Sequence, residues 1–370
     1  MRRLFSTALF LLAAFAPQVA SASQNYGGLF DVEARRAALQ TPALASMKAA
    51  CLAIAIDPKW KKIPVIAGLD ETEGYGTDRT ANDFNWAVMV LAGRSLAGDT
   101  AATEELKQFL LDWSSQHAFE KTQVVHDAYY SLKRVMLPTA VAYSILRPAL
   151  SKAEDTQIRD WIDPLVRDVD QLFDGEVDLN NHRDLADSVL MVWGGIIGDD
   201  TLYQKGYQRF LEMLSVARPD GSLPLETRRG ARALWYTRQA LSSMVVMAEV
   251  ARGHGDDLYS QQHGNVSFWT IFSFLLNGLS NPVLVDAYAA QNYIPGPVDD
   301  YRHLDFGFLE RRSNGRNYLA SMEALAIQPP TSFALQRIDQ MFDTYALGQR
   351  PLIDEFVGGN ATCFWGAPKS

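Results

Sequence analysis

The sequence predicts an all-α protein, specifically an incomplete (α/α) barrel or toroid of antiparallel helical hairpins. Apolar residues recur at the i, i+3/i+4, i+7 spacing of buried helix faces along most of the chain, whereas alternating strand patterns are scarce. Short breaks with turn chemistry, such as Pro295-Gly296-Pro297, separate the periodic segments. Helices joined by short loops favour antiparallel neighbours, and without a repeat of fixed length a regular solenoid is not expected.

The predicted helices follow one another through most of the chain. Each carries one apolar stripe, as Phe84, Val88 and Leu91 do in the earliest of them. In chain order, the periodic segments are 84–96, 106–113, 127–148, 154–172, 185–196, 202–217, 231–252, 266–279 and 331–347. A stretch rich in glycine and charge, 68–78, interrupts the early helices and is a candidate cleft wall, with an ordinary surface loop as the alternative.

The first 22 residues resemble a secretory signal peptide. Arg2 and Arg3 form a basic start, an apolar run extends to Ala16, and small residues ending at Ala22 suit cleavage after that position. The apolar run is shorter than the roughly 20 residues that span a bilayer, so we expect no membrane span in the mature protein. We therefore expect 23–370 to form one α/α-toroid domain in the periplasm or outside the cell.

Composition narrows the function classes. The formal net charge of −9 argues against a general nucleic-acid binder, so any polyanion must be held by a local basic patch. Cys51 and Cys363 are the two cysteines, and in an oxidising compartment such a pair most simply forms a disulfide, with two buried thiols as the alternative. No motif indicates a metal site, and we expect no cofactor.

Two short segments carry the chemistry. Asn181 and His182 precede a periodic run, where an asparagine could simply cap a helix. Further on, Arg229 and Tyr236 are separated by two helical turns, which predicts that both lie on one helix face, with Arg232 beside them. That face lies opposite the apolar stripe; it is either a solvated basic surface or one wall of a cleft for an acidic ligand.

These residues resemble the alginate lyases with an α/α-toroid fold and the related glucuronan lyases. The match consists of the Asn-Asn-His element at 180–182 and of a Leu-Pro-x-Glu-x-x-Arg-x-x-Arg-Ala-Leu-x-Tyr element at 223–236. The resemblance implies that Asn181 and Arg229 neutralise a uronate carboxylate. It also implies that His182 abstracts a proton and that Tyr236 protonates the leaving oxygen.

The sequence departs from the alginate-specific members in two places. Gln239 stands where those members carry a second tyrosine, and the early loop at 73–79 has no lysine at the matching place. The resemblance therefore implies β-elimination on an acidic polysaccharide, a β-1,4-linked polyuronate, and leaves open whether this is alginate (polymannuronate) or glucuronan.

Elimination beside a carboxylate needs three kinds of group. The carboxylate must be neutralised so that the enolate-like intermediate can form, a base must reach C5, and an acid must reach the bridging oxygen. His182 can act as base near neutral pH, although one tyrosine could serve as both base and acid. We predict that further side chains contact the sugar chain: Arg232, Gln239, Tyr75, Arg79, His126 and Arg134.

Two other functions fit the same sequence. A glycoside hydrolase on an α/α barrel would need two carboxylates about 5 to 10 Å apart, with Asp184, Asp187, Glu226 and Asp305 as the available candidates. A non-catalytic periplasmic protein that binds polyuronates would need only the basic cleft. The products distinguish the three, because only a lyase makes an unsaturated, ultraviolet-absorbing uronate.

Overall fold

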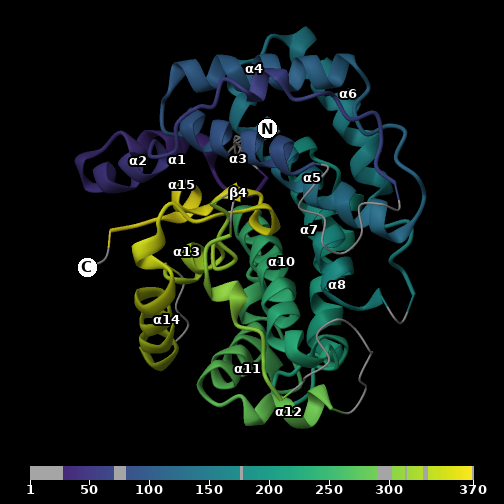
Figure 1. The fold of residues 1–370 in the computed structure, drawn as a ribbon, viewed down its shortest axis with the longest axis vertical. Coiled ribbons are helices and arrows are strands. Elements are labelled where there is room, and N and C mark those ends of the chain that lie inside the picture. Colours follow the sequence, from purple (N-terminus) through teal and green to yellow (C-terminus); the bar gives the residue numbers. More distant parts are fainter. Residues whose placement is uncertain are drawn as a thin grey trace, which may run out of the picture.

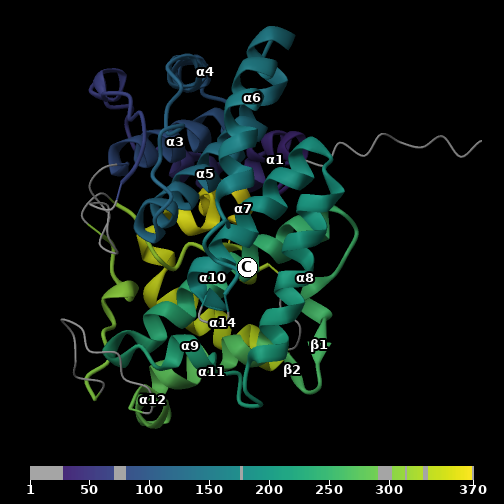
Figure 2. The ribbon, with the colours of Figure 1, turned by 90° about the vertical axis from the view of Figure 1, so that its right-hand side faces the viewer.

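The computed structural model describes residues 28–70, 81–175, 178–290, 302–312, 315–327 and 332–368 (Figures 1 and 2). The predicted signal peptide, and with it the predicted localisation, lies outside these residues. Most of the glycine-rich stretch 68–78 also lies outside them.

The described residues form an all-α structure, as the sequence predicts. The helices are α1 (Val32–Leu39), α2 (Ala45–Cys51), α3 (Asn82–Leu96), α4 (Thr100–Ser115), α5 (His126–Leu146), α6 (Lys152–Asp168), α7 (Asn181–Ile197), α8 (Asp200–Val216), α9 (Pro224–Thr227), α10 (Ala233–Gly253), α11 (Phe268–Ser280), α12 (Val283–Ala289), α13 (Met322–Leu325), α14 (Ser332–Tyr345) and α15 (Ala361–Trp365). Every segment with predicted helical periodicity contains one of them.

Strands are confined to two short antiparallel pairs in the described part of the chain. β1 (Gln262–His263) pairs with β2 (Val266–Ser267), and this hairpin packs against α8 (Figure 2). β3 (Ile353–Asp354) pairs with β4 (Gly359–Asn360), and β4 packs against α3. The second pair brings the C-terminal segment onto the helical core.

The helices form an inner and an outer layer. Inner helices α3, α5, α7 and α10 pack side by side in that order, and α4, α6 and α8 pack outside them (Figure 1). Position in the layer explains burial. All of α7 from Asn181 to Ile196 is buried, whereas α6 buries only one stripe. A helix covered on all sides must carry apolar side chains, or polar side chains with hydrogen-bond partners, around its whole circumference. This is the pattern of an inner helix in a toroid.

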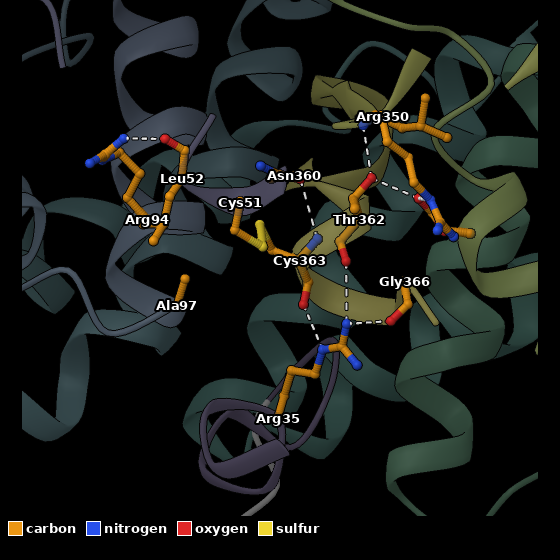
Figure 3. The surroundings of a disulfide bond; sticks show 12 residues. Arg35, Cys51, Leu52, Arg94, Ala97, Arg350, Asn360, Thr362, Cys363 and Gly366 are labelled. Carbon is orange, nitrogen blue, oxygen red and sulfur yellow. Dashed lines mark hydrogen bonds and ion pairs between the residues drawn. A yellow bond between two sulfur atoms is a disulfide. The ribbon is translucent and has the colours of Figure 1, made fainter. Parts of the chain in front are cut away.

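The C-terminal helix is tied to the first helices by a disulfide. Cys51 at the end of α2 is bonded to Cys363 in α15, with a Cα–Cα distance of 5.5 Å, which confirms the predicted pairing (Figure 3). Arg35 of α1 donates to the carbonyl oxygens of Cys363 at 2.6 Å and Gly366 at 2.7 Å. These carbonyls lie at a helix end, where intrahelical partners are lacking, so the arginine satisfies them.

In the described residues no single helix is long and apolar enough to cross a membrane. Together, α11 and α12 pass by length and composition, but they are bent by 109° at their junction. Most apolar side chains of α11 are buried in the protein core.

Candidate active site

The residues predicted to be catalytic converge on the N-terminal ends of the inner helices. Asn181 and His182 begin α7, and Tyr236 lies in the first turn of α10. Together with α5 and the C-terminal segment, His182 and Tyr236 line a pocket of about 130 Å³, whereas Asn181 and Arg229 are not among its lining residues. Its lining residues are Tyr130, Arg134, His182, Arg232, Trp235, Tyr236, Gln239, Arg312, Arg316, Tyr318 and Phe356. Because N–H groups at a helix start are free of intrahelical partners, this rim favours negative charge.

The prediction that Arg229 and Tyr236 share a helix face is wrong. Helix α9 ends at Thr227, Arg229 precedes a short 3₁₀ helix at Gly230–Arg232, and α10 starts only at Ala233. Gly230 has a φ of 59°, a left-handed conformation that interrupts an α-helix. The chain nevertheless folds back, so the guanidinium carbon of Arg229 lies 4.2 Å from the ring centroid of Tyr236.

Asn181 is the first residue of α7 rather than its cap. Asn180 is the cap, because its side-chain oxygen accepts a hydrogen bond from the backbone N–H of His182 at 2.8 Å. Asn181 is fully buried, and its backbone N–H donates to Glu226 Oε1 at 2.7 Å. Its side-chain Nδ2 donates to Gln239 Oε1 at 2.6 Å. The capping alternative for Asn181 is therefore excluded.

His182 lies between aromatic side chains at the pocket wall. Its ring stacks on Tyr130 with centroids 4.3 Å apart, and the Phe173 ring lies 6.1 Å away. Burial holds the pKa of His182 well below its ordinary value of 6.5, and the cations Lys133 and Arg229 lower it further. The imidazole is therefore neutral at neutral pH and able to accept a proton.

One wall of the pocket contains two buried arginines, Arg134 and Arg316. Arg134 Nε donates to Glu355 Oε1 at 2.5 Å, and Arg316 is paired with Asp354 at 2.7 Å and with Glu355 at 2.9 Å. Asp354 also pairs with Arg238 at 3.5 Å. Two carboxylates thus face three guanidinium groups, which leaves this wall with an excess of positive charge.

Of the predicted sugar-contacting residues, Arg134, Arg232 and Gln239 line the pocket. His126 is exposed at the start of α5 and meets Phe173 edge-on at 5.4 Å, one ring away from His182. Tyr75 and Arg79 lie outside the described residues.

Five further pocket-lining residues lie outside the sequence motifs: Tyr130, Arg312, Arg316, Tyr318 and Phe356. Two of them are arginines of the basic run that starts at Arg311, and this run was the available signal. This run has no helical periodicity. It is also far along the chain from the segments at 180–182 and 223–236, so the sequence does not show that it lies beside them in the fold.

The carboxylates considered for a hydrolase do not line this pocket. Asp184 and Asp187 are buried, and burial raises the pKa of each carboxyl well above its ordinary value. Burial likewise raises the pKa of Glu226 to about 7. Asp305 lies 3.4 Å from Arg232. In the described part of the chain, the residues lining the pocket include four arginines and no aspartate or glutamate, so these residues supply no carboxylate pair of the kind that hydrolysis requires.

Known proteins match this chain at three levels. A model of the alginate lyase family matches residues 98–284, which is half of the chain. A polysaccharide lyase of Stenotrophomonas maltophilia (strain K279a) is 28% identical over 213 residues. That match covers 55% of this chain and spans 64% of the length of the relative.

Solved structures match over almost the whole chain. Alginate lyase A1-III from Sphingomonas species A1 is 20% identical with a TM-score of 0.74, covering 93% of this chain and 97% of that one. A histidine-to-alanine variant of A1-III complexed with a tetrasaccharide gives a TM-score of 0.76 at 18% identity, over 95% of this chain and 98% of that one. An alginate lyase from Bacteroides ovatus gives 0.58 at 15% identity, over 90% and 96%. These likenesses establish the toroid fold, and the family model, which covers both catalytic segments, establishes the family: the chain belongs to the alginate lyase family.

Proposed function

We propose that the protein is an exported polysaccharide lyase that cleaves a β-1,4-linked polyuronate, either alginate (polymannuronate) or glucuronan, by β-elimination. The observation that carries the proposal is the pocket itself. Among the described residues, those that line it include His182, whose imidazole is neutral, Tyr236 and four arginines, and none is acidic. Membership of the alginate lyase family and the likeness to a polysaccharide lyase support the same reaction class.

Asn181 and Arg229 are proposed to neutralise the uronate carboxylate. The guanidinium group is a permanent cation with a planar fork that matches a carboxylate, and Arg229 lies against the Tyr236 ring, next to the pocket. Asn181 adds a neutral N–H donor at the N-terminal end of α7. Donors held in place before the reaction stabilise the charge that develops on the enolate-like intermediate.

His182 and Tyr236 are proposed to transfer the protons. The depressed pKa of His182 keeps its imidazole in the form that can accept the C5 proton. Tyr236 lines the same pocket and would protonate the bridging oxygen as the bond to C4 breaks. For a substrate with the C5 proton on the side of the leaving group, Tyr236 would take both roles.

A panel of polymannuronate, polyguluronate and glucuronan tests the reaction class. A lyase produces unsaturated ends, so absorbance in the ultraviolet rises without water being consumed. Saturated new ends would instead identify a hydrolase, and a polymer that is bound but keeps its length would identify a binding protein. Either of these two results would refute the lyase.

Tyr236→Phe tests the mechanism on the best polymer of that panel. The variant keeps the ring that packs against Arg229 and removes only the hydroxyl, so we expect kcat to fall by roughly 10² or more while polymer binding changes little. Tyr207→Phe on α8 is the matched control and should keep full activity. Ordinary turnover in Tyr236→Phe would exclude the tyrosine as a proton-transfer group.

Export is proposed from the signal-like N-terminus. Sequencing the N-terminus of the mature protein from periplasmic and culture fractions should give a chain that begins at Ser23. A chain in the cytoplasm that retains Arg2 and Arg3 would contradict it.

A further inference from the structure

Gln239 connects the two helices that carry the catalytic residues. It lies on α10 one turn after Tyr236, and its side chain is 5% exposed. Its Oε1 accepts a hydrogen bond from Nδ2 of Asn181 on α7 at 2.6 Å. The amide oxygen of Gln239 is thus committed to Asn181, although the residue lines the substrate pocket.

The orientation of the Asn181 carboxamide depends on this contact. Its nitrogen carries two hydrogens, of which one is donated to Gln239 and the other makes no hydrogen bond among the described residues. Its oxygen Oδ1 is buried without a hydrogen-bond partner among the described residues. Glu226 holds only the backbone N–H of Asn181, so it does not determine which way the carboxamide faces.

Rotation of the carboxamide would reverse its effect on an anion. The last side-chain torsion of asparagine has two broad, nearly equivalent orientations, which exchange oxygen and nitrogen. A nitrogen facing a carboxylate donates to it and helps neutralise it. An oxygen in the same place repels it.

We infer that Gln239 is a positioning residue, which acts by fixing the orientation of the buried Asn181 carboxamide behind the pocket wall, with its nitrogen directed to help neutralise the uronate carboxylate, rather than by contacting the sugar. This inference rests on the proposed lyase function. It replaces the expectation that Gln239 positions a sugar hydroxyl with a role that is exerted through Asn181.

Two substitutions separate these roles. Gln239→Met keeps the length of the side chain and removes the acceptor. We expect kcat to fall about tenfold or more while KM stays within about threefold, because a misplaced Asn181 carboxamide stabilises the transition state less. Gln239→Glu keeps an acceptor oxygen for Asn181 and should retain a higher kcat than Gln239→Met, with a raised KM because the added charge repels the substrate. Gln340→Met on the exposed face of α14 is the control and should match the wild type.

A double-mutant cycle gives the second measurement. In an Asn181→Ala background, Gln239→Met should cause little further loss, because the group that it positions is absent. Binding of the polymer to Tyr236→Phe should also be unchanged by adding Gln239→Met. An equal fold-loss with and without Asn181, or weaker binding in the Tyr236→Phe background, would overturn the positioning role in favour of direct sugar contact. A wild-type protein inactive on every polyuronate would instead overturn the function on which the inference rests.

Discussion

The catalytic assignment of His182 depends on its charge. The side chain is 6% exposed, stacked on Tyr130, and close to the cations Lys133 and Arg229. Burial and the nearby Lys133 and Arg229 all disfavour the imidazolium form. The imidazole that we propose as base therefore stays unprotonated when the solution becomes mildly acidic.

This charge state can be measured directly. Because protonated His182 is disfavoured in the folded protein, its ring should take up a proton only at a pH well below 6.5. Titration followed by nitrogen-detected NMR, with His182→Ala to assign the signals, should give such a midpoint. A midpoint at or above 6.5 would mean that the ring is more hydrated or closer to an anion than the structure indicates.

The sequence identified some pocket residues and not others for a physical reason. His182 and Tyr236 line the pocket and occur in two compact motifs, so local pattern was sufficient to point to them. Arg316 reaches the pocket only because Asp354 and Glu355 hold it from the C-terminal segment. No periodicity encodes that pairing, since it depends on how distant parts of the chain pack.

Among the elements, the start of α7 shows the limit of pattern reading. Its apolar spacing begins near Leu185, yet the helix starts at Asn181. The first turn consists of buried polar residues, which carry no apolar pattern. The shared face of Arg229 and Tyr236 was predicted by extending helical spacing back from the run at 231–252 to Arg229, and the left-handed conformation of Gly230 breaks that spacing. The sequence therefore predicted which helices form, but not where the helices near the pocket begin.

Glu226 links α9 to the start of α7 and should make stability depend on pH. Burial raises its pKa from 4.5 to about 7, so the folded state favours the protonated carboxyl. The contribution of protonated Glu226 to folding stability is fully present below pH 4.5 and is lost as the pH rises towards about 7. The reason is that Glu226 ionises at a lower pH in the unfolded chain than in the folded protein.

Glu226→Gln removes that titration and keeps an acceptor for the Asn181 backbone N–H. Between pH 5 and pH 8 the stability of the variant relative to the wild type should rise by about 2 to 3 kcal/mol. Urea unfolding of both proteins at the two pH values gives this difference. Identical pH dependence in both would show that Glu226 titrates near its ordinary value.

In the whole molecule, the inner and outer helix layers place the N-terminal ends of α5, α7 and α10 on one rim. The C-terminal segment closes that rim with Arg316, Tyr318 and Phe356. The pocket is consequently assembled from parts of the chain that meet only in the finished toroid, and its integrity depends on how the C-terminal segment is held.

The disulfide is expected to contribute to that hold. The bond closes a loop of 312 residues, and cross-links of long loops typically stabilise by about 2 to 4 kcal/mol. Cys51→Ser with Cys363→Ser should lower the unfolding midpoint by a corresponding amount, measured without reductant. In the unreduced wild type, mass spectrometry should detect no alkylatable thiol. Two alkylated cysteines would show that the bond is not formed.

The length of that loop also sets the order of events during synthesis. Cys363 is synthesised 312 residues after Cys51, so the Cys51 thiol has no disulfide partner while the intervening helices are being synthesised. Every nascent or truncated chain that lacks α15 therefore carries a reactive sulfur at residue 51. Formation of this disulfide therefore requires that the chain has been synthesised at least to α15 and that α2 and α15 are in contact.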